Sequence, residues 1–289
     1  MKHVTYHRPE RLEDALELLD TKKVVAPMAG GTDLVVQMRD GRRCPDAILD
    51  LSGLKMSGVQ KAGSSWLIEA GTTMTQLIEA VEKVEAQGLE LVAKAAQRLG
   101  AHQIQNRATI GGNICNASPA ADAVCALTAL SAEAVVQSKK GRRTIPFTEL
   151  FKGPGETALE PGELLVQVEV PERKVPKGAR VVRHYFKVGG RTSLVCAICS
   201  LAAVTVMKGD EIVSSAMALG SVAPIPWLAA FPEALLRGEK LTEKLVDEAA
   251  KAAREEVSPI DDVRASRAYR RDVVQALVAQ HLVACGPEA

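Results

Sequence analysis

The order of apolar and polar residues predicts strands and helices that alternate irregularly through the first half of the chain. Residues 8–20, RPERLEDALELLD, repeat apolar side chains at the spacing of one helix face. Residues 22–31, KKVVAPMAGG, read as a short strand that runs into two glycines, and 47–54, AILDLSGL, as a strand and turn. The intervening TDLVVQMRDG fits a helix or a strand.

Further along, SSWLIEAGTTMTQLIEAV (64–81) predicts a strand, a glycine turn and a helix capped by threonine. LELVAKAAQRL (89–99) and VCALTALSA (124–132) predict helices, and AEAVVQSKKGRRTIPF (132–147) predicts a hairpin. The alternating strand LLVQVEVP stops at Pro171, and the polar segment 172–179 reads as a linker.

The last third of the chain predicts long apolar strands followed by helices. VVRHYFKVGGRTSLVCAICSLAAVTV (181–206) and EIVSSAMALGSVAPIPW (211–227) supply the strands, and residues 239–257 and 266–284 supply two helices. Strands and helices in separate clusters favour an α+β fold of two or three lobes over a regular βαβ array.

Composition narrows the classes of function. Hydrophobic residues make up 47% of the 289 residues, which is enough for a large core, and the net charge is +1. A near-neutral chain with 3% aromatic residues lacks both the basic surface and the stacking platform of a nucleic-acid-binding protein. No stretch is long and apolar enough for a membrane span, and the charged N-terminus does not resemble a signal peptide, so we expect a cytoplasmic protein with reduced cysteines.

Two stretches share an unusual glycine chemistry. Residues 27–33, PMAGGTD, and 109–113, TIGGN, each read as a Gly-Gly pair directly after an apolar strand, flanked by threonine and a short polar side chain. Backbone N–H groups that converge at glycines form a nest that suits a pyrophosphate. The alternative is a pair of tight turns. A Walker A motif is absent, and GPGETA (153–158) lies in a turn-rich segment without the strand and helix of a dinucleotide fingerprint.

With these motifs the chain resembles the FAD-binding medium subunit of the molybdenum hydroxylases, the family of xanthine dehydrogenase and aerobic carbon monoxide dehydrogenase. AGGTDL and QIQNRATIGGNICNASPAAD are similar to the two flavin motifs of that family. The similarity continues through FTELFKGPGETALEPGELLVQVEVP and HYFKVGGR to SPIDDVRASRAYRR, in the same order and over nearly the whole chain.

The resemblance implies an α+β fold with an FAD-binding domain of the vanillyl-alcohol-oxidase (PCMH) type at 1–175. Its subdomains would span about 1–57 and 58–175, and a C-terminal domain of a three-stranded sheet and helices would span 176–289. FAD would lie between the subdomains and the C-terminal domain. Its contacts would come from Pro27, Met28, Ala29, Gly30, Gly31, Thr32, Asp33, Leu34, Ala101, Thr109, Gly111, Gly112, Asn113, Cys115, Asn116, Asp122, Leu165 and Lys187.

Within this set, the resemblance gives different residues different parts of the cofactor. Residues 27–34 would wrap the pyrophosphate, with Thr109, Gly112 and Asn113 as a second wall. Asn116 and Asp122 would lie towards the ribose and adenine end, and Leu165 and Lys187 near the flavin ring. Lys187 would stabilise reduced, anionic flavin by Coulomb attraction.

Structural roles compete with some of these assignments. Ser118 and Pro119 read as the N-cap and first residue of a helix, and Asp122 could complement the dipole of that helix. Lys187 could be a solvated strand charge. Cys196 and Cys199 lie in an apolar run, where strand positions three apart point to opposite faces and do not chelate one metal ion. The loop after Lys187 lacks the aromatic residue that covers the flavin in many relatives.

The function implied by the resemblance is electron transfer through FAD in a molybdenum hydroxylase, with no catalytic base or metal ligand in this chain. A large subunit would hold molybdenum–pterin, and a small subunit would hold two [2Fe–2S] clusters, in a dimer of heterotrimers. FAD would pass electrons to NAD⁺ or another acceptor. We expect a xanthine or N-heterocycle dehydrogenase, with a carbon monoxide or aldehyde enzyme as the alternative. A stand-alone flavoprotein oxidase and a scaffold with an empty site are the rival classes.

Overall fold

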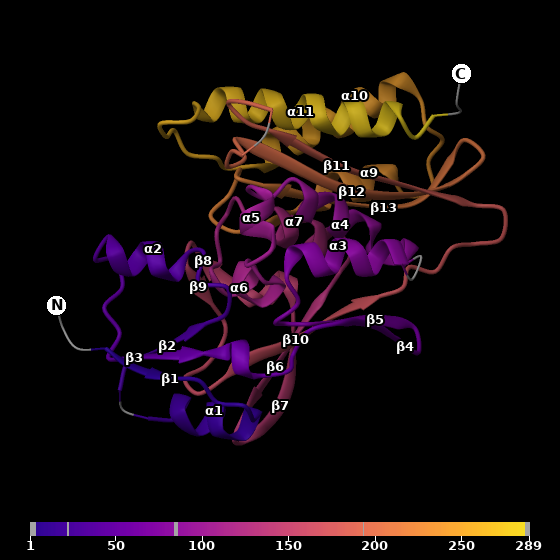
Figure 1. The fold of residues 1–289 in the computed structure, drawn as a ribbon. Helices are drawn as coiled ribbons and strands as arrows, with labels where there is room; N and C mark the ends of the chain where they lie inside the picture. The colour runs from indigo at the N-terminus through magenta and orange to yellow at the C-terminus, as the bar shows by residue number, and fades with distance from the viewer. Residues whose placement is uncertain (1–3, 22, 84–85, 193, 287–289) are drawn as a thin grey trace.

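A computed structural model describes residues 4–21, 23–83, 86–192 and 194–286 (Figure 1). The N-terminal part holds a parallel three-stranded sheet in the order β1 (Thr5–His7), β3 (Ala47–Asp50), β2 (Val25–Met28). Helix α1 (Leu12–Leu19) buries Ala15 and Leu16 in a small core with Leu49. Helix α2 (Leu34–Arg39) follows β2, and the short 3₁₀ helix η1 (Leu51–Gly53) follows β3.

The middle part is built on an antiparallel five-stranded sheet. Its strand order is β4 (Val59–Ala62), β5 (Ser65–Glu69), β10 (Leu164–Pro171), β6 (Glu133–Ser138), β7 (Gly141–Pro146). Its helices are α3 (Met74–Lys83), η2 (Gln87–Leu89), α4 (Glu90–Gln97), α5 (His102–Gln105), α6 (Ile110–Cys115), α7 (Asp122–Ala129) and α8 (Phe147–Leu150). A hairpin of β8 (Phe151–Gly153) and β9 (Glu156–Thr157) precedes β10. Every residue of α7 is buried, so this helix lies at the centre of the molecule.

The C-terminal part is an antiparallel sheet between two layers of helices (Figure 1). The sheet has three long strands, β11 (Arg180–Val188), β12 (Cys199–Lys208) and β13 (Glu211–Gly220). The two-residue strand β14 (Trp227–Leu228) pairs with β13. Helices α9 (Ala230–Leu236), α10 (Glu243–Glu256) and α11 (Arg267–Val283) follow. The sheet packs on α11 at one face and on α7 of the middle part at the other. The C-terminal sheet therefore shares a core with the middle part.

Strand β11 shows this division residue by residue, because alternate side chains point to opposite faces. Tyr185 belongs to the core shared with the middle part, whereas Phe186 packs with the helices of the C-terminal part. His184 also faces α11, where its Nδ1 lies 2.9 Å from Nδ1 of the fully buried His281. Nε2 of His281 lies 2.8 Å from the Thr205 hydroxyl. Burial lowers the pKa of His281 to about 3, so this histidine is neutral in the folded protein.

Two local predictions from the sequence are wrong. The second glycine pair does not follow a strand: it lies in the first turn of α6, with Thr109 at the N-cap. Ser118 and Pro119 do not open a helix, since α7 begins at Asp122 and its N-cap residue is Ala121. The Ser118 side chain instead accepts a hydrogen bond from the Ala120 amide within the loop. By contrast, the ambiguous segment after the first glycine pair is a helix, α2.

Candidate functional site

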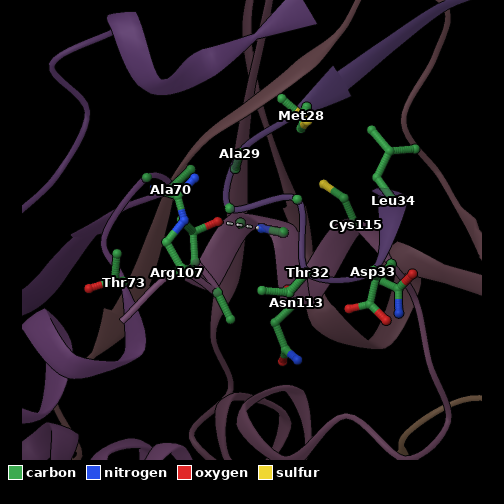
Figure 2. A pocket seen from close by; sticks show the side chains of 18 of the residues that line it. Met28, Ala29, Thr32, Asp33, Leu34, Ala70, Thr73, Arg107, Asn113 and Cys115 are labelled. Atoms are coloured by element: carbon green, nitrogen blue, oxygen red, sulfur yellow. Dashed lines mark hydrogen bonds between the residues drawn. The ribbon is translucent and has the colours of Figure 1, made fainter. Parts of the chain in front are cut away.

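A cavity of about 700 Å³ lies where the N-terminal, middle and C-terminal parts meet. Figure 2 shows side chains from both glycine segments around it. Every predicted site residue lines this cavity except Ala101. Ala101 is the N-cap residue of α5, and its neighbour Gly100 lines the cavity instead. The fold therefore brings together segments that are about 80 residues apart in the sequence.

The first glycine segment, residues 29–34, connects β2 to α2 and offers free backbone donors. Within the described residues, nothing accepts a hydrogen bond from the amides of Gly30, Gly31, Thr32 or Asp33. Buried or half-buried amides are normally paired, so a run of free ones beside a cavity is suited to an anion. The backbone of Gly30 lies so close to Arg107 that a Cβ on Gly30 would come within 1.8 Å of the Arg107 carbonyl oxygen.

The second glycine segment, residues 109–113, uses its own backbone donors inside the protein. The amide of Ile110 donates to Thr72, that of Gly111 to Ala70, and that of Gly112 to the Thr109 hydroxyl at 3.0 Å. The expectation of a second backbone cradle is therefore wrong. Gly111 is needed for packing instead, since a Cβ there would lie 2.8 Å from the Ala70 carbonyl oxygen. This segment presents side chains to the cavity.

Asn113 gives the clearest sign that a polar ligand belongs in the cavity. Its side-chain oxygen is buried and, among the described residues, has no hydrogen-bond partner. Leaving a buried polar atom unpaired costs about 1–3 kcal/mol. A ligand with hydroxyl groups, such as the ribityl or ribose part of a dinucleotide, would satisfy it. The free amides, the Gly30 contact and this oxygen together fit an extended cofactor that carries a diphosphate.

The end of the cavity formed by β11 holds a buried ion pair. Nζ of Lys187 lies 2.7 Å from Oδ2 of Asp122, and the two side chains are only 7% and 6% exposed. The same ammonium donates to the Arg98 carbonyl at 2.9 Å. Tyr185 donates to Oδ1 of Asp122 at 2.5 Å. Burial raises the pKa of Asp122 above its ordinary value, and the bonds from Lys187 and Tyr185 offset this only in part.

This ion pair corrects two predictions. Lys187 is not a solvated strand charge, because its side chain is almost fully buried. Asp122 and Lys187 were also expected at opposite ends of the cofactor, yet the two side chains touch. An extended dinucleotide cannot place its adenine and its flavin ring at one spot, so both residues belong to the same end. Asp122 does occupy the first residue of α7, where a carboxylate complements the helix dipole.

Several lining residues were not singled out from the sequence. Thr73 and Gln76 form a capping box at the start of α3, and Thr73 also pairs with Thr109 as an isolated β-bridge. The dipeptide Gly71-Thr72, which resembles Gly31-Thr32, was a usable signal for this third segment. Gln37 on α2 donates to Asn116 at 3.0 Å and so ties the first segment to the end of α6. No pattern in the sequence pointed to this bond.

The cysteines hold no metal site in the described part of the chain. Cys199 begins strand β12, but Cys196 precedes the strand and lines the cavity, so the expectation that both lie in one strand is wrong. Cys115 also lines the cavity, and its side chain is exposed. In place of an aromatic residue, Leu194, Val195 and Cys196 form the wall beside Lys187.

The segment before β12 is fixed by a buried arginine. Arg270 on α11 is 3% exposed and donates to the carbonyls of Ile198, at 2.5 Å, and Ser221, at 2.7 Å. It also bonds Asp262, in the loop before α11, at 2.8 Å. Arg270 therefore ties that loop to the ends of β12 and β13, next to the cavity wall.

Comparison with known proteins assigns this architecture. The family model described as the FAD binding domain in molybdopterin dehydrogenase matches residues 2–173. The CO dehydrogenase flavoprotein C-terminal domain matches residues 184–284. The chain belongs to this flavoprotein family. The boundary predicted near residue 175 lies between the two matched stretches.

Relatives in the flavoprotein family align over almost their full length. The chain is 34% identical over 273 residues to the glyceraldehyde dehydrogenase medium chain of Sulfolobus acidocaldarius, covering 94% of this chain and 95% of that one. It is 29% identical to the xanthine dehydrogenase FAD-binding subunit of Escherichia coli O157:H7, covering 94% and 92%. A chain in the structure of carbon monoxide dehydrogenase from Hydrogenophaga pseudoflava superposes with a TM-score of 0.91 at 29% identity, covering 98% and 96%.

Relatives in the flavoprotein family include medium chains and FAD-binding subunits of dehydrogenases. The chain is thus an FAD-domain subunit of the molybdenum hydroxylase family. No helix in the described residues combines the length and the apolar character required to cross a bilayer.

Proposed function

We propose that the chain binds FAD in the central cavity and transfers electrons from the [2Fe–2S] clusters of a partner subunit to an external acceptor. The free amides of residues 30–33 carry this proposal, because they have no hydrogen-bond partner among the described residues and Gly30 lies directly against Arg107. They would bind the diphosphate, and Asn113 would hold a hydroxyl of the cofactor. When bound, FAD supplies the redox chemistry, since it exchanges electrons with one-electron and two-electron partners.

The residues at the β11 end have a separate task in this proposal. Lys187 and Asp122 would face the flavin ring, as the family resemblance implies for Lys187. Their buried pair gives that end of the cavity fixed charges with little reorganisation, which favours charge stabilisation on the ring. Leu165 and the wall of Leu194 and Val195 would exclude water beside the ring.

The partners follow from the same resemblance. We propose a large molybdopterin subunit that oxidises the substrate and a small subunit with two [2Fe–2S] clusters, assembled as a dimer of heterotrimers in the cytoplasm. The acceptor would be NAD⁺. The substrate would be xanthine or another N-heterocycle, supported by the 29% identity to the xanthine dehydrogenase subunit. An aldehyde is the second candidate, favoured by the 34% identity to the glyceraldehyde dehydrogenase chain.

Reconstitution and co-purification test the proposal. The purified chain should take up about one FAD and show a flavin absorption spectrum, without turning over substrate alone. A chain that binds no FAD would refute the cofactor assignment, and turnover by the lone chain would favour a stand-alone oxidase. The complex from the native cell should contain molybdenum and iron. Its rates with xanthine, nicotinate and glyceraldehyde, each with NAD⁺ or a dye as acceptor, would decide between the two substrate classes.

A further inference from the structure

Tyr185 contacts the cavity only through another residue. Its hydroxyl donates to Asp122, its ring lies in the core shared with the middle part, and it is absent from the residues that line the cavity. Lys187, two residues further along β11, points to the same face of the strand and bonds the other oxygen of the same carboxylate. The two oxygens of Asp122 are thus held by two side chains from one strand.

The geometry makes Asp122 sensitive to the loss of either donor. A buried carboxylate is costly unless hydrogen bonds or an opposite charge compensate it. Here burial raises the pKa of Asp122, while Lys187 and Tyr185 both act to lower it. A carboxylate has about four acceptor sites, so these two bonds leave others for a ligand in the cavity that Asp122 lines.

We propose that Tyr185 is a positioning residue of the flavin site. It keeps Asp122 ionised, so that the negative charge of Asp122 compensates the positive charge of Lys187 beside the ring. The inference rests on the proposed FAD site. With Tyr185 intact, the pair contributes no net charge. Without its hydroxyl, Asp122 takes up a proton more readily, and the uncompensated ammonium then favours the reduced, anionic flavin over the oxidised form.

Other charged and titratable groups lie near the pair. Arg98, at the end of α4, acts on Asp122 from a distance and lowers its pKa. Cys125 on α7 lies close to both Asp122 and Tyr185, and burial raises the pKa of its thiol to about 12. Tyr185 is itself kept neutral, because burial raises its pKa well above the ordinary value. Asp122 is therefore the group whose proton uptake would change the charge.

The test is the reduction potential of FAD bound to the full chain, measured from pH 6 to 9 by equilibration with redox dyes. Reduction to the anionic form takes two electrons from the reductant and one proton from solvent. At the acidic end of this range, Tyr185→Phe should raise the ratio of reduced to oxidised FAD about tenfold relative to the wild type. This corresponds to a rise of about 30 mV in the reduction potential of a two-electron couple. The rise should shrink as the pH increases, because Asp122 ionises again.

Tyr6→Phe is the matched control. Tyr6 also donates to an aspartate, Asp50, but neither residue lines the cavity. This variant should follow the wild-type potential at every pH. Asp122→Asn cannot ionise, so it should show the raised potential over the whole range, and it serves also if Tyr185→Phe folds poorly.

If the potential of Tyr185→Phe follows that of Tyr6→Phe across the pH range, the role of Tyr185 is refuted. An Asp122→Asn potential equal to that of the wild type would refute it as well. Failure of the wild-type chain to bind FAD is a different result, since it refutes the proposed function itself. Normal FAD binding in all variants with unchanged potentials would sink only this inference.

Discussion

A single methyl group at Gly30 should push the first glycine segment away from Arg107. In Gly30→Ala the new Cβ would lie 1.8 Å from the Arg107 carbonyl oxygen, whereas an ordinary contact needs at least 3.4 Å, so the backbones must move apart by about 1.6 Å. Hydrogen bonds of about 2.9 Å do not survive such a displacement. Losing one bond to a charged phosphate, worth about 1.5–3 kcal/mol, would weaken FAD binding by about 10- to 100-fold.

The assay is calorimetric titration of the apo chain with FAD, together with the flavin-to-protein ratio after gel filtration. Urea unfolding should show an overpacking cost of about 1–3 kcal/mol, small enough to leave the chain folded. Gly153→Ala is the control, because a Cβ there meets only a glutamate oxygen at 3.8 Å and Gly153 does not line the cavity. Equal FAD affinity in the two variants would refute the reasoning.

Three further predictions concern stability, each measured by urea unfolding. Because the pKa of folded His281 is about 3 and that of an unfolded histidine about 6.5, the unfolded state binds the extra proton and stability falls as the pH drops from 6 to 4. The wild type should lose about 1.4 kcal/mol per pH unit relative to His281→Gln; parallel curves would contradict this. Thr109→Val should cost about 1 kcal/mol through loss of the α6 cap, whereas Thr109→Ser should not. Arg270→Met should cost about 3 kcal/mol, against less than about 1 kcal/mol for the exposed Arg267→Met; similar values would show that burial of Arg270 is unimportant.

Much of the architecture follows from patterns that act over short distances. Apolar runs predicted the long strands of the C-terminal sheet, and the threonine before α3 was recognised as a cap because side-chain capping is local. All of the predicted site residues except Ala101 line the cavity, but they were named only with the help of the family resemblance, and many other lining residues were not predicted. Glycine pairs by themselves indicate close approach of the backbone, but they do not say what approaches.

The errors share one physical cause, which is that tertiary contacts decide what a local motif does. TIGGN looked like a strand followed by a nest, yet bonds from its amides to Thr72 and Ala70 fix it as the start of α6. Ser118-Pro119 had the chemistry of a helix start. The Pro119 carbonyl, however, accepts a hydrogen bond from the backbone amide of Ser221, which fixes these residues as a loop. The Asp122–Lys187 pair joins residues 65 positions apart, and nothing local indicates it.

The placement of Lys187 on β11 has a consequence for biosynthesis. Domains generally fold as units in the order in which the ribosome releases them, N-terminal first. Both glycine segments emerge well before β11, which shares a core with α7, and before residues 194–196, which supply the last wall of the cavity. A nascent chain therefore acquires the loop proposed to bind phosphate early, but it can retain the prosthetic group only once translation has passed the C-terminal sheet, so cofactor loading comes late in synthesis.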